Sequence, residues 1–396
     1  MKAKDRRLDE IRTLIPEVMP TEALALQSAG ALLIDVREAD EIAAGSPKQA
    51  LRLGRGFLEL RIEDTVADKS RTLLTMCAGG MRSLFAADAL RNMGYTDVRS
   101  VAGGFNRWKN QGLPFETPLT LDADARERYS RHLLLPEVGE AGQIKLMGSK
   151  VLLIGAGGLG SPSAYYLAAA GVGTLGVVDH DVVDRSNLQR QILHTEARVG
   201  MPKVDSARET LEALNPKIKV VGYKTHLDAD NVEDILSGYD VIVDGTDNLP
   251  TRYLINDACV KLGLPNVHAA VYRFEGQITV FWPGRILPAP LDPAKYRGGC
   301  YRCMFPEPPP AEMAPSCSEI GVLGVMPGVI GVLQAVETIK ILLDIGEPLV
   351  GKMLYYDALR ANFTEFKLKR NPQCRYCSEG APFPGYVDYA QVCATP

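Results

Sequence analysis

Residues 151–190 read VLLIGAGGLGSPSAYYLAAAGVGTLGVVDHDVVDRSNLQR. The stretch begins with a continuous apolar run, residues 151–154, and continues with three glycines in the spacing G-x-G-x-x-G, which are Gly155, Gly157 and Gly160. An alanine-rich helical segment and a second apolar run ending at Asp179 follow. This pattern predicts a strand, a tight turn, a helix and a second parallel strand. The glycines allow the backbone to approach a phosphate at the N-terminus of the helix, so the stretch predicts a nucleotide site.

The residues after Asp179 bear on which nucleotide chemistry takes place. An NAD-dependent oxidoreductase fits the glycines and the acidic residue, and beyond these it needs only a base for its substrate. This chain supplies a larger and mostly polar set, which consists of Asp181, Ser186, Asn187, Leu188, Gln189, Arg190, Gln191, Lys203, Asp247 and Asn248. Phosphoryl and nucleotidyl transfer require cations that neutralise developing charge and an acid that holds magnesium. The set favours that chemistry, and the oxidoreductase remains the alternative.

The segments that follow extend an α/β fold. Lys203 begins a helical pattern, residues 239–244 form a third buried strand just before Asp247, and residues 266–281 contain two further strands. Ligands of an open parallel sheet lie beyond the carboxyl ends of its strands. We therefore expect a Rossmann-like, doubly wound sheet in which Asp179 and Asp247 meet the glycines in one crevice.

The motif from Asp179 to Arg190, together with Lys203 and Asp247, resembles the activating enzymes of ubiquitin-like proteins. The resemblance is closest to the bacterial adenylyltransferases that activate the sulfur carriers of molybdopterin and thiamin synthesis, and it covers roughly residues 122–377. It implies that ATP and Mg²⁺ bind in the crevice. It also implies that the substrate is the C-terminal Gly-Gly carboxylate of a small ubiquitin-like sulfur carrier protein.

The resemblance further implies a role for each matched residue. These roles are ATP contact for Gly158 and its neighbours, ribose binding for Asp179, contact with the nucleotide and phosphates for Asn187, Gln189 and Arg190, phosphate charge stabilisation for Lys203, and Mg²⁺ binding for Asp247. Arg131 matches an arginine that in this family reaches across a homodimer into the neighbouring site. On composition alone, the same arginine would be part of a solvated helix face.

The cysteines near the C-terminus predict a metal site. They form two Cys-x-x-Cys pairs, Cys300 with Cys303 and Cys374 with Cys377. Four thiolates at this spacing suit a closed, structural tetrahedral zinc, although disulfides or a redox pair would use the same residues. Cys317 lies in the long proline-rich loop between the pairs. It matches a cysteine that some relatives use to hold the carrier covalently and that others do not require.

The first segment carries a second chemical signal. Cys77 follows an apolar strand pattern and begins the glycine-bearing loop Cys-Ala-Gly-Gly-Met-Arg82, which leads into a helix. Loop N–H groups and the positive end of the helix dipole favour a thiolate there, so Cys77 is expected to be a nucleophile. A phosphatase would place five residues between the cysteine and the arginine, whereas four separate Cys77 from Arg82. The loop, with residues 35–38 (DVRE) and 102–108 (AGGFNRW), resembles the rhodanese family of sulfurtransferases, whose cysteine carries a persulfide sulfur. We expect Cys77 and Arg82 to be the catalytic residues of this loop.

Two domains follow from these signals. We expect a rhodanese-like domain over residues 1–118, a linker at about residues 112–121, and an adenylyltransferase domain over residues 122–396. Relatives that fuse the two domains usually carry the rhodanese at the C-terminus, whereas here it comes first. The combined expectation is carrier adenylation followed by sulfur transfer from Cys77 to give a thiocarboxylate, with a cysteine desulfurase or thiosulfate as the sulfur donor. The alternative is a rhodanese that only regulates or binds.

The bulk properties exclude several other classes. The chain has 396 residues, a hydrophobic fraction of 46% and a net charge of −4, and it shows no basic tract of the kind that binds nucleic acid. Residues 320–336 form the longest apolar run, but glycines and a proline interrupt it, which favours a buried helix over a membrane span. Paired cysteines that read as metal ligands indicate a reducing compartment. We therefore expect a cytoplasmic protein, and the resemblance to the activating enzymes implies a homodimer.

Overall fold

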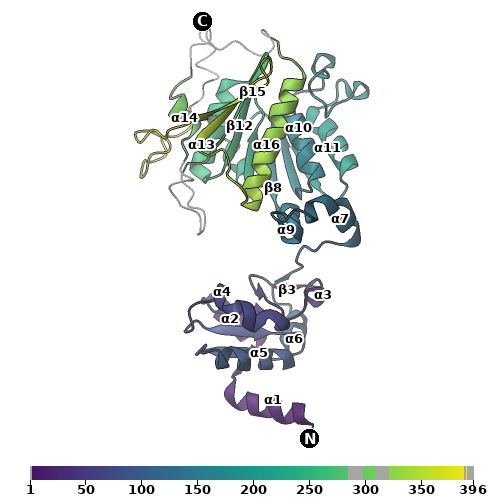
Figure 1. The fold of residues 1–396 in the computed structure, drawn as a ribbon, viewed down its shortest axis with the longest axis vertical. Coiled ribbons are helices and arrows are strands. Elements are labelled where there is room, and N and C mark those ends of the chain that lie inside the picture. Colours follow the sequence, from purple (N-terminus) through teal and green to yellow (C-terminus); the bar gives the residue numbers. More distant parts are fainter. Residues whose placement is uncertain (1, 284–297, 309–320, 388, 390–396) are drawn as a thin grey trace. The chain divides into compact units, whose positions relative to one another are not determined.

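The computed structural model describes residues 2–283, 298–308, 321–387 and 389. The chain divides into two units, Met1–Thr120 and Leu121–Pro396, each with its own sheet and helices (Figure 1). Both units are of the α/β class, which confirms the expected fold class.

The first unit contains a five-stranded parallel sheet in the order β1-β6-β5-β2-β4. Its strands are β1 (Glu17–Val18), β2 (Leu32–Asp35), β4 (Leu51–Arg52), β5 (Leu73–Met76) and β6 (Val98–Val101), beside a small antiparallel pair, β3 (Ser46–Pro47) and β7 (Phe115–Glu116). Its helices are α1 (Ala3–Leu14), α2 (Pro20–Ser28), α3 (Ala39–Ile42), η1 (Arg55–Phe57), α4 (Leu58–Thr65), α5 (Met81–Asn92) and α6 (Gly104–Asn110). The loop that begins at Cys77 therefore joins the end of β5 to α5.

Alternating residues of the central strands bury both faces of this sheet. Ile34 and Leu73 lie in one apolar cluster with residues of α1, α4 and α5. Leu33 and Leu74 lie in a second cluster with Trp108 of α6 and residues of α2. Burial on both faces explains why these strands read as continuous apolar runs, and it gives the unit a core of its own.

The second unit contains an eight-stranded sheet in the order β10-β9-β8-β11-β12-β13-β14-β15. Its strands are β8 (Lys150–Ile154), β9 (Thr174–Val178), β10 (Lys219–Tyr223), β11 (Val241–Asp244), β12 (Asn266–Tyr272), β13 (Glu275–Phe281), β14 (Lys352–Asp357) and β15 (Asn362–Lys367). The described helices are α7 (Ala123–Arg128), α8 (Ser130–Leu133), α9 (Gly139–Gly148), α10 (Gly160–Ala169), η2 (Arg185–Asn187), η3 (Glu196–Arg198), α11 (Lys203–Leu214), α12 (Val232–Leu236), α13 (Leu249–Leu262), α14 (Tyr301–Met304) and α16 (Val325–Leu343). In the order of the sheet, the five strands from β10 to β12 run parallel. The last three strands, β13, β14 and β15, each pair antiparallel with the strand before them.

The central strand β8 shows how the helices cover this sheet. Val151 and Leu153 lie in the large cluster with residues of α10, α11 and α16, whereas Leu152 and Ile154 lie in the cluster with α12 and α13. Figure 1 shows α16 beside α10 in front of the sheet, and α16 packs directly on α10 and β12. Helices thus cover both faces, as a doubly wound sheet requires.

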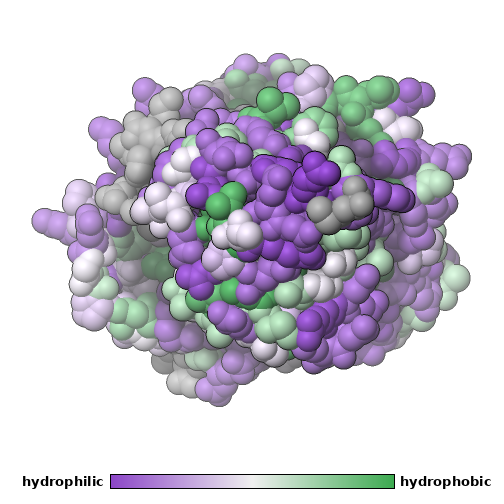
Figure 2. All heavy atoms as spheres, turned by 90° about the horizontal axis from the view of Figure 1, so that it is seen from below, coloured by the Kyte–Doolittle hydropathy of each residue, from purple (hydrophilic) through white to green (hydrophobic). Residues whose placement is uncertain are grey.

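Among the described residues, one helix, Val325–Leu343, is long and apolar enough to cross a membrane, and half of its most apolar window is buried inside the unit. Its buried face carries Gln334, whose Nε2 donates to the carbonyl oxygens of Asp244 (2.8 Å) and Val267 (2.9 Å). These contacts fix α16 to β11 and β12, as in the core helix of a globular domain. In the view of Figure 2, hydrophilic side chains dominate and hydrophobic ones form small patches.

Candidate functional site

The glycine turn after β8 is built where no side chain fits. Gly155 has a φ of +95°, and a Cβ on it would lie 3.0 Å from the carbonyl oxygen of Gly245. A Cβ on Gly160 would lie 1.9 Å from the carbonyl oxygen of Gly155, so any side chain there would separate α10 from β8. The Ala156 N–H donates to Oδ2 of Asp179 (2.8 Å). This bond fastens the turn to the end of β9.

A cleft of about 880 Å³ lies beyond the carboxyl ends of β8, β9 and β11. It brings together nine of the residues predicted from the sequence, which are Gly155, Gly157, Gly158, Asp179, Asp181, Arg190, Lys203, Asp247 and Asn248. Asp247 is exposed in the cleft, and Asn248 caps α13 by accepting the N–H of Thr251 (3.0 Å). An exposed carboxylate beside a glycine turn and two cations has the donor chemistry to hold Mg²⁺ on a polyphosphate.

Lys203 begins α11, as the sequence predicted, and is 5% exposed. Its Nζ lies 2.7 Å from Oδ2 of Asp181. Burial alone would raise the pKa of Asp181, but the hydrogen bond and charge of Lys203 outweigh burial and lower that pKa. The pair holds the ammonium group in the cleft wall, where it can meet a phosphate.

Other predicted residues do not line this cleft. Ser186, Asn187, Leu188 and Gln189 are absent from its lining, as are Gly160 and Arg131. The Ser186 hydroxyl instead donates to Asp184 (2.5 Å), the residue that caps η2, and a Cβ on Gly324 would meet Oε1 of Gln189 at 2.2 Å. The stretch therefore packs against the start of α16. Arg131 is exposed on α8, and Cys317 lies outside the described residues.

Sequence reasoning included Gln191 in the polar set but gave it no role, and it missed three further residues of the cleft. Gln191 is 5% exposed, and its Oε1 has no hydrogen-bond partner among the described residues. Tyr386, Val387 and Tyr389, from the segment after the last cysteine pair, also line the cleft. The position of Gln191 directly after Arg190 was a usable signal. The aromatic tail gave no local signal because only the tertiary fold returns it to the cleft.

The four predicted metal ligands lie together. The Sγ–Sγ distances are 3.9 Å for Cys300–Cys303, 3.6 Å for Cys300–Cys374 and 3.4 Å for Cys303–Cys377. Zinc–sulfur bonds of about 2.3 Å in a tetrahedron place sulfurs about 3.8 Å apart, so the cluster fits zinc. None of the four forms a disulfide. The donor set is closed and suits a structural ion.

A buried ion pair connects this cluster to the cleft wall. Arg302, between the first two cysteines, makes two 2.7 Å hydrogen bonds to the carboxylate of Asp257 on α13. Arg302 also donates to the hydroxyl of Tyr389 (2.8 Å) and to the carbonyl oxygen of Pro306 (3.2 Å). The cluster therefore positions α14, α13 and the C-terminal segment relative to one another.

In the first unit, Cys77 lies at the mouth of the predicted loop and is 1% exposed. The Gly80 N–H donates to its Sγ (3.1 Å), and the Ser83 hydroxyl lies 3.5 Å from the same sulfur. Gly104 presses on this loop, because a Cβ on it would lie 2.1 Å from the carbonyl oxygen of Cys77. The tight loop directs the backbone N–H of Gly80 at the thiol sulfur.

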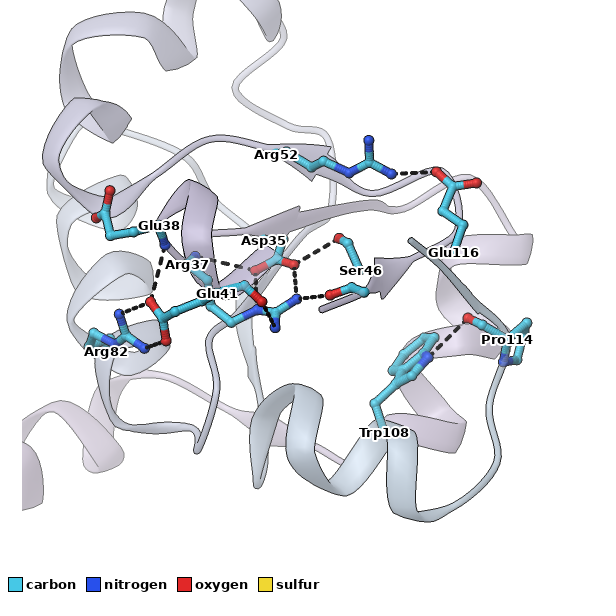
Figure 3. Close-up of polar contacts among 11 residues, drawn as sticks. Asp35, Arg37, Glu38, Glu41, Ser46, Arg52, Arg82, Trp108, Pro114 and Glu116 are labelled. Carbon is cyan, nitrogen blue, oxygen red and sulfur yellow. Dashed lines mark hydrogen bonds and ion pairs between the residues drawn. The ribbon is translucent and has the colours of Figure 1, made fainter. Parts of the chain in front are cut away.

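Two ion pairs stabilise the surroundings of this loop (Figure 3). Asp35 and Arg37 form a buried pair at 2.6 Å, and Asp35 also accepts the hydroxyl of Ser46 (2.8 Å). Arg82 donates to both carboxylate oxygens of Glu41, at 2.7 and 2.5 Å. The Arg82 hydrogen bond lowers the pKa of Glu41 to about 2. The loop arginine predicted to be catalytic is thus held by a carboxylate from α3.

Family models match both units. The ThiF family model matches residues 129–376, and the rhodanese-like domain model matches residues 19–111. The chain belongs to the ThiF family and carries a rhodanese-like domain. This membership confirms the two resemblances drawn from the motifs around Cys77 and Asp179.

Relatives of this ThiF family member carry matching names. The SAMP-activating enzyme E1 of Haloferax volcanii is 47% identical over 70% of this chain and 98% of its own length. The sulfur carrier protein adenylyltransferase of Thermus thermophilus is 48% identical over 67% and 96%. The adenylyltransferase and sulfurtransferase MOCS3-1 of Zea mays is 50% identical over 69% of this chain and 56% of its own length. The expectation of an adenylyltransferase and sulfurtransferase enzyme is confirmed at the level of the family.

A solved structure shares the fold. The microcin C7 biosynthetic enzyme MccB in complex with N-formylated MccA matches with a TM-score of 0.54 and 22% identity, covering 74% of this chain and 82% of that chain. At this identity the likeness concerns the fold alone.

Proposed function

We propose that this protein adenylates the C-terminal Gly-Gly carboxylate of a ubiquitin-like sulfur carrier and then transfers sulfur from a persulfide on Cys77 to form a thiocarboxylate. The observation that carries the proposal is the cleft in which the glycine turn meets Arg190, Lys203 and Asp247. The names of the relatives support a carrier protein as substrate. They favour adenylation over the NAD-dependent alternative.

In the first step, a carboxylate oxygen of the carrier attacks the α-phosphorus of ATP and pyrophosphate leaves. The glycine turn and the N-terminus of α10 give the phosphates backbone donors, and Asp179 faces the ribose. Arg190 and Lys203 neutralise the charge that develops on the phosphates. Mg²⁺ held by Asp247 would add charge neutralisation on the same oxygens, and Arg131 of a second protomer would complete the site in a homodimer.

In the second step, the terminal sulfur of the Cys77 persulfide attacks the carbonyl carbon of the acyl-adenylate, and AMP leaves. The product is an acyl disulfide between the carrier and Cys77. A thiol, for which Cys317 is the candidate, or an external thiol reductant then attacks the Cys77 sulfur of this disulfide. A new disulfide forms between Cys77 and the attacking thiol, and the S–S bond to the carrier breaks and releases the thiocarboxylate. The zinc expected at the four cysteines has no part in this chemistry, because a closed thiolate set leaves no open position.

The adenylation step is tested by carrier-dependent exchange between ATP and pyrophosphate. Replacement of Lys203 or Asp247 by Ala is expected to lower the exchange rate by about 100-fold or more, because each removes a charge from the transition state. Asp234→Ala is the matched control, since this exposed carboxylate lies outside the cleft lining. If wild-type protein shows no pyrophosphate exchange with any Gly-Gly carrier tested, the proposal is contradicted.

A second candidate function for the rhodanese-like domain is that it only binds or regulates and transfers no sulfur. The Gly80 N–H directed at the sulfur of Cys77 favours chemistry at that sulfur. Cys77→Ala should abolish thiocarboxylate formation while leaving pyrophosphate exchange intact. Unchanged thiocarboxylate yield in this variant would leave only the regulatory role. The pathway of the carrier, whether molybdopterin synthesis, thiamin synthesis or another, can be identified by testing carriers from each pathway. We expect the protein itself to be found in the cytoplasmic fraction of the cell.

A further inference from the structure

Arg82 is the only charged residue in the segment from Cys77 to Ser83. A free guanidinium at this place would attract an anionic sulfur donor to the thiol. In the structure it is not free, because both of its terminal nitrogens bind the carboxylate of Glu41. Figure 3 shows the two side chains meeting edge to edge, with Glu41 also accepting the backbone N–H of Glu38 (3.2 Å).

The charge on Arg82 acts on Cys77 as well as on Glu41. The pKa of Arg82 is raised first by its hydrogen bond to Glu41 and also by the charges of Glu41, Cys77 and Glu38. Glu41 keeps its negative charge at any physiological pH, since its pKa is about 2. The Arg82–Glu41 pair is therefore electrically neutral when Cys77 reacts, and Glu38 adds a further negative charge nearby.

The remaining groups at the sulfur are neutral dipoles. The Gly80 N–H donates to Sγ (3.1 Å), whereas the Ser83 hydroxyl accepts from Sγ (3.5 Å) and from Ser100 (2.9 Å) and donates to the carbonyl oxygen of Gly80 (2.9 Å). A single N–H dipole stabilises one thiolate or one persulfide sulfur. It does not offset several negative charges gathered at the same point.

We propose that Glu41 masks the charge of Arg82 and so makes Cys77 accept sulfur from a thiol-borne persulfide, such as one on a desulfurase cysteine, in preference to thiosulfate. This inference rests on the proposed sulfurtransferase function and decides between the two donors left open for it. Glu41 touches neither donor nor thiol in this role, and it acts only by positioning and neutralising Arg82.

The charge of the reacting pair explains the preference. With thiosulfate, the Cys77 thiolate attacks the outer sulfur, a new S–S bond forms, and the old S–S bond breaks with its electron pair leaving on sulfite. That pair carries three negative charges in total. With a protonated persulfide, R–S–SH, the same attack gives the Cys77 persulfide and a departing R–S⁻, and the pair carries one negative charge. A masked cation penalises the first reaction far more than the second.

The test compares donor use by wild type and Glu41→Gln, a change that removes the mask and retains a hydrogen-bonding side chain. Sulfur loading of Cys77 is measured with thiosulfate and, separately, with a persulfide-loaded cysteine desulfurase. We expect kcat/KM for thiosulfate to rise about tenfold or more, with a steeper dependence on salt, and loading from the persulfide to change little. The double variant Glu41→Gln/Arg82→Gln should lose the gain.

The matched control is Glu63→Gln, which breaks the ion pair with Lys69; Lys69 precedes β5, whereas Cys77 follows the other end of this strand. It should leave both donors unaffected. No gain with thiosulfate in folded Glu41→Gln, or an equal gain with both donors, overturns the inference. If Glu41→Gln does not fold, Arg82→Gln decides, because the unmasked Glu41 should then lower thiosulfate use further. A wild-type protein that takes sulfur from neither donor would instead overturn the sulfurtransferase proposal itself.

Discussion

Gln191 is a buried residue of the cleft whose acceptor oxygen has no partner among the described residues. An unpaired buried acceptor costs folding energy, so removing it should not destabilise the protein. We predict that Gln191→Leu keeps or raises the melting temperature while KM for ATP or for the carrier rises about tenfold, because the ligand loses a hydrogen bond. Thermal unfolding and pyrophosphate exchange measure the two effects. A lower melting temperature with unchanged KM would assign the residue a structural role.

His194 makes the free energy of unfolding of the second unit depend on pH. Its Nε2 donates to the carbonyl oxygen of Ala156 in the glycine turn (3.0 Å), and its Nδ1 lies 2.9 Å from the hydroxyl of Ser206. Burial lowers the pKa of His194 below its ordinary value of 6.5. As the pH falls below 6.5, the unfolded chain therefore binds a proton that the folded chain does not, and the free energy of unfolding decreases.

We predict that this free energy falls by up to about 1.4 kcal/mol per pH unit on account of His194. Urea unfolding between pH 7.5 and 5.5 measures it. His194→Gln should be less stable than wild type near pH 7.5 and lose this part of the acid sensitivity. His226→Gln, a change at an exposed histidine, should retain it. Parallel curves for wild type and His194→Gln would contradict the assignment.

At the scale of elements, the four-cysteine cluster joins α14 to the segment after β15. The buried pair of Arg302 and Asp257 also holds α14, and a structural zinc would add folding energy directly. We predict about one zinc per chain in wild type, and in Cys374→Ser a loss of the metal with a melting temperature several degrees lower. Metal analysis and calorimetry test both. Cys259→Ser is the control, because this buried core cysteine lies outside the cluster and should leave the zinc content unchanged.

At the scale of the whole molecule, each unit has its own sheet and its own apolar clusters. We predict that residues 1–120 and residues 121–396 fold when produced separately. The first should form a Cys77 persulfide, and the second should catalyse carrier-dependent pyrophosphate exchange. Circular dichroism and the two assays test this. If the two separate units form no thiocarboxylate, alone or mixed, while the full chain does, the covalent connection between them is required for sulfur delivery.

Much of the site was predictable because its signals are local. The glycine spacing after residues 151–154, the helix that begins at Lys203 and the two Cys-x-x-Cys pairs each occupy a few consecutive residues. Strand burial and turn geometry act over that same range, so sequence pattern and structure agree there. Ser186 and Gln189 were expected at the nucleotide site, but they do not line the cleft. Ser186 bonds to the residue that caps η2, and Gln189 packs against the start of α16.

The sequence by itself determined the fold class, the two kinds of chemistry and the residues that could carry them, since backbone conformation and ligand type follow from short patterns. Only the tertiary structure decided which charges meet. It pairs Arg82 with Glu41 across 41 residues, leaves Oε1 of Gln191 without a hydrogen-bond partner in the described part of the chain, and returns Tyr389 to the cleft. Ion pairing and burial depend on distance in space, and chain separation carries no record of that distance.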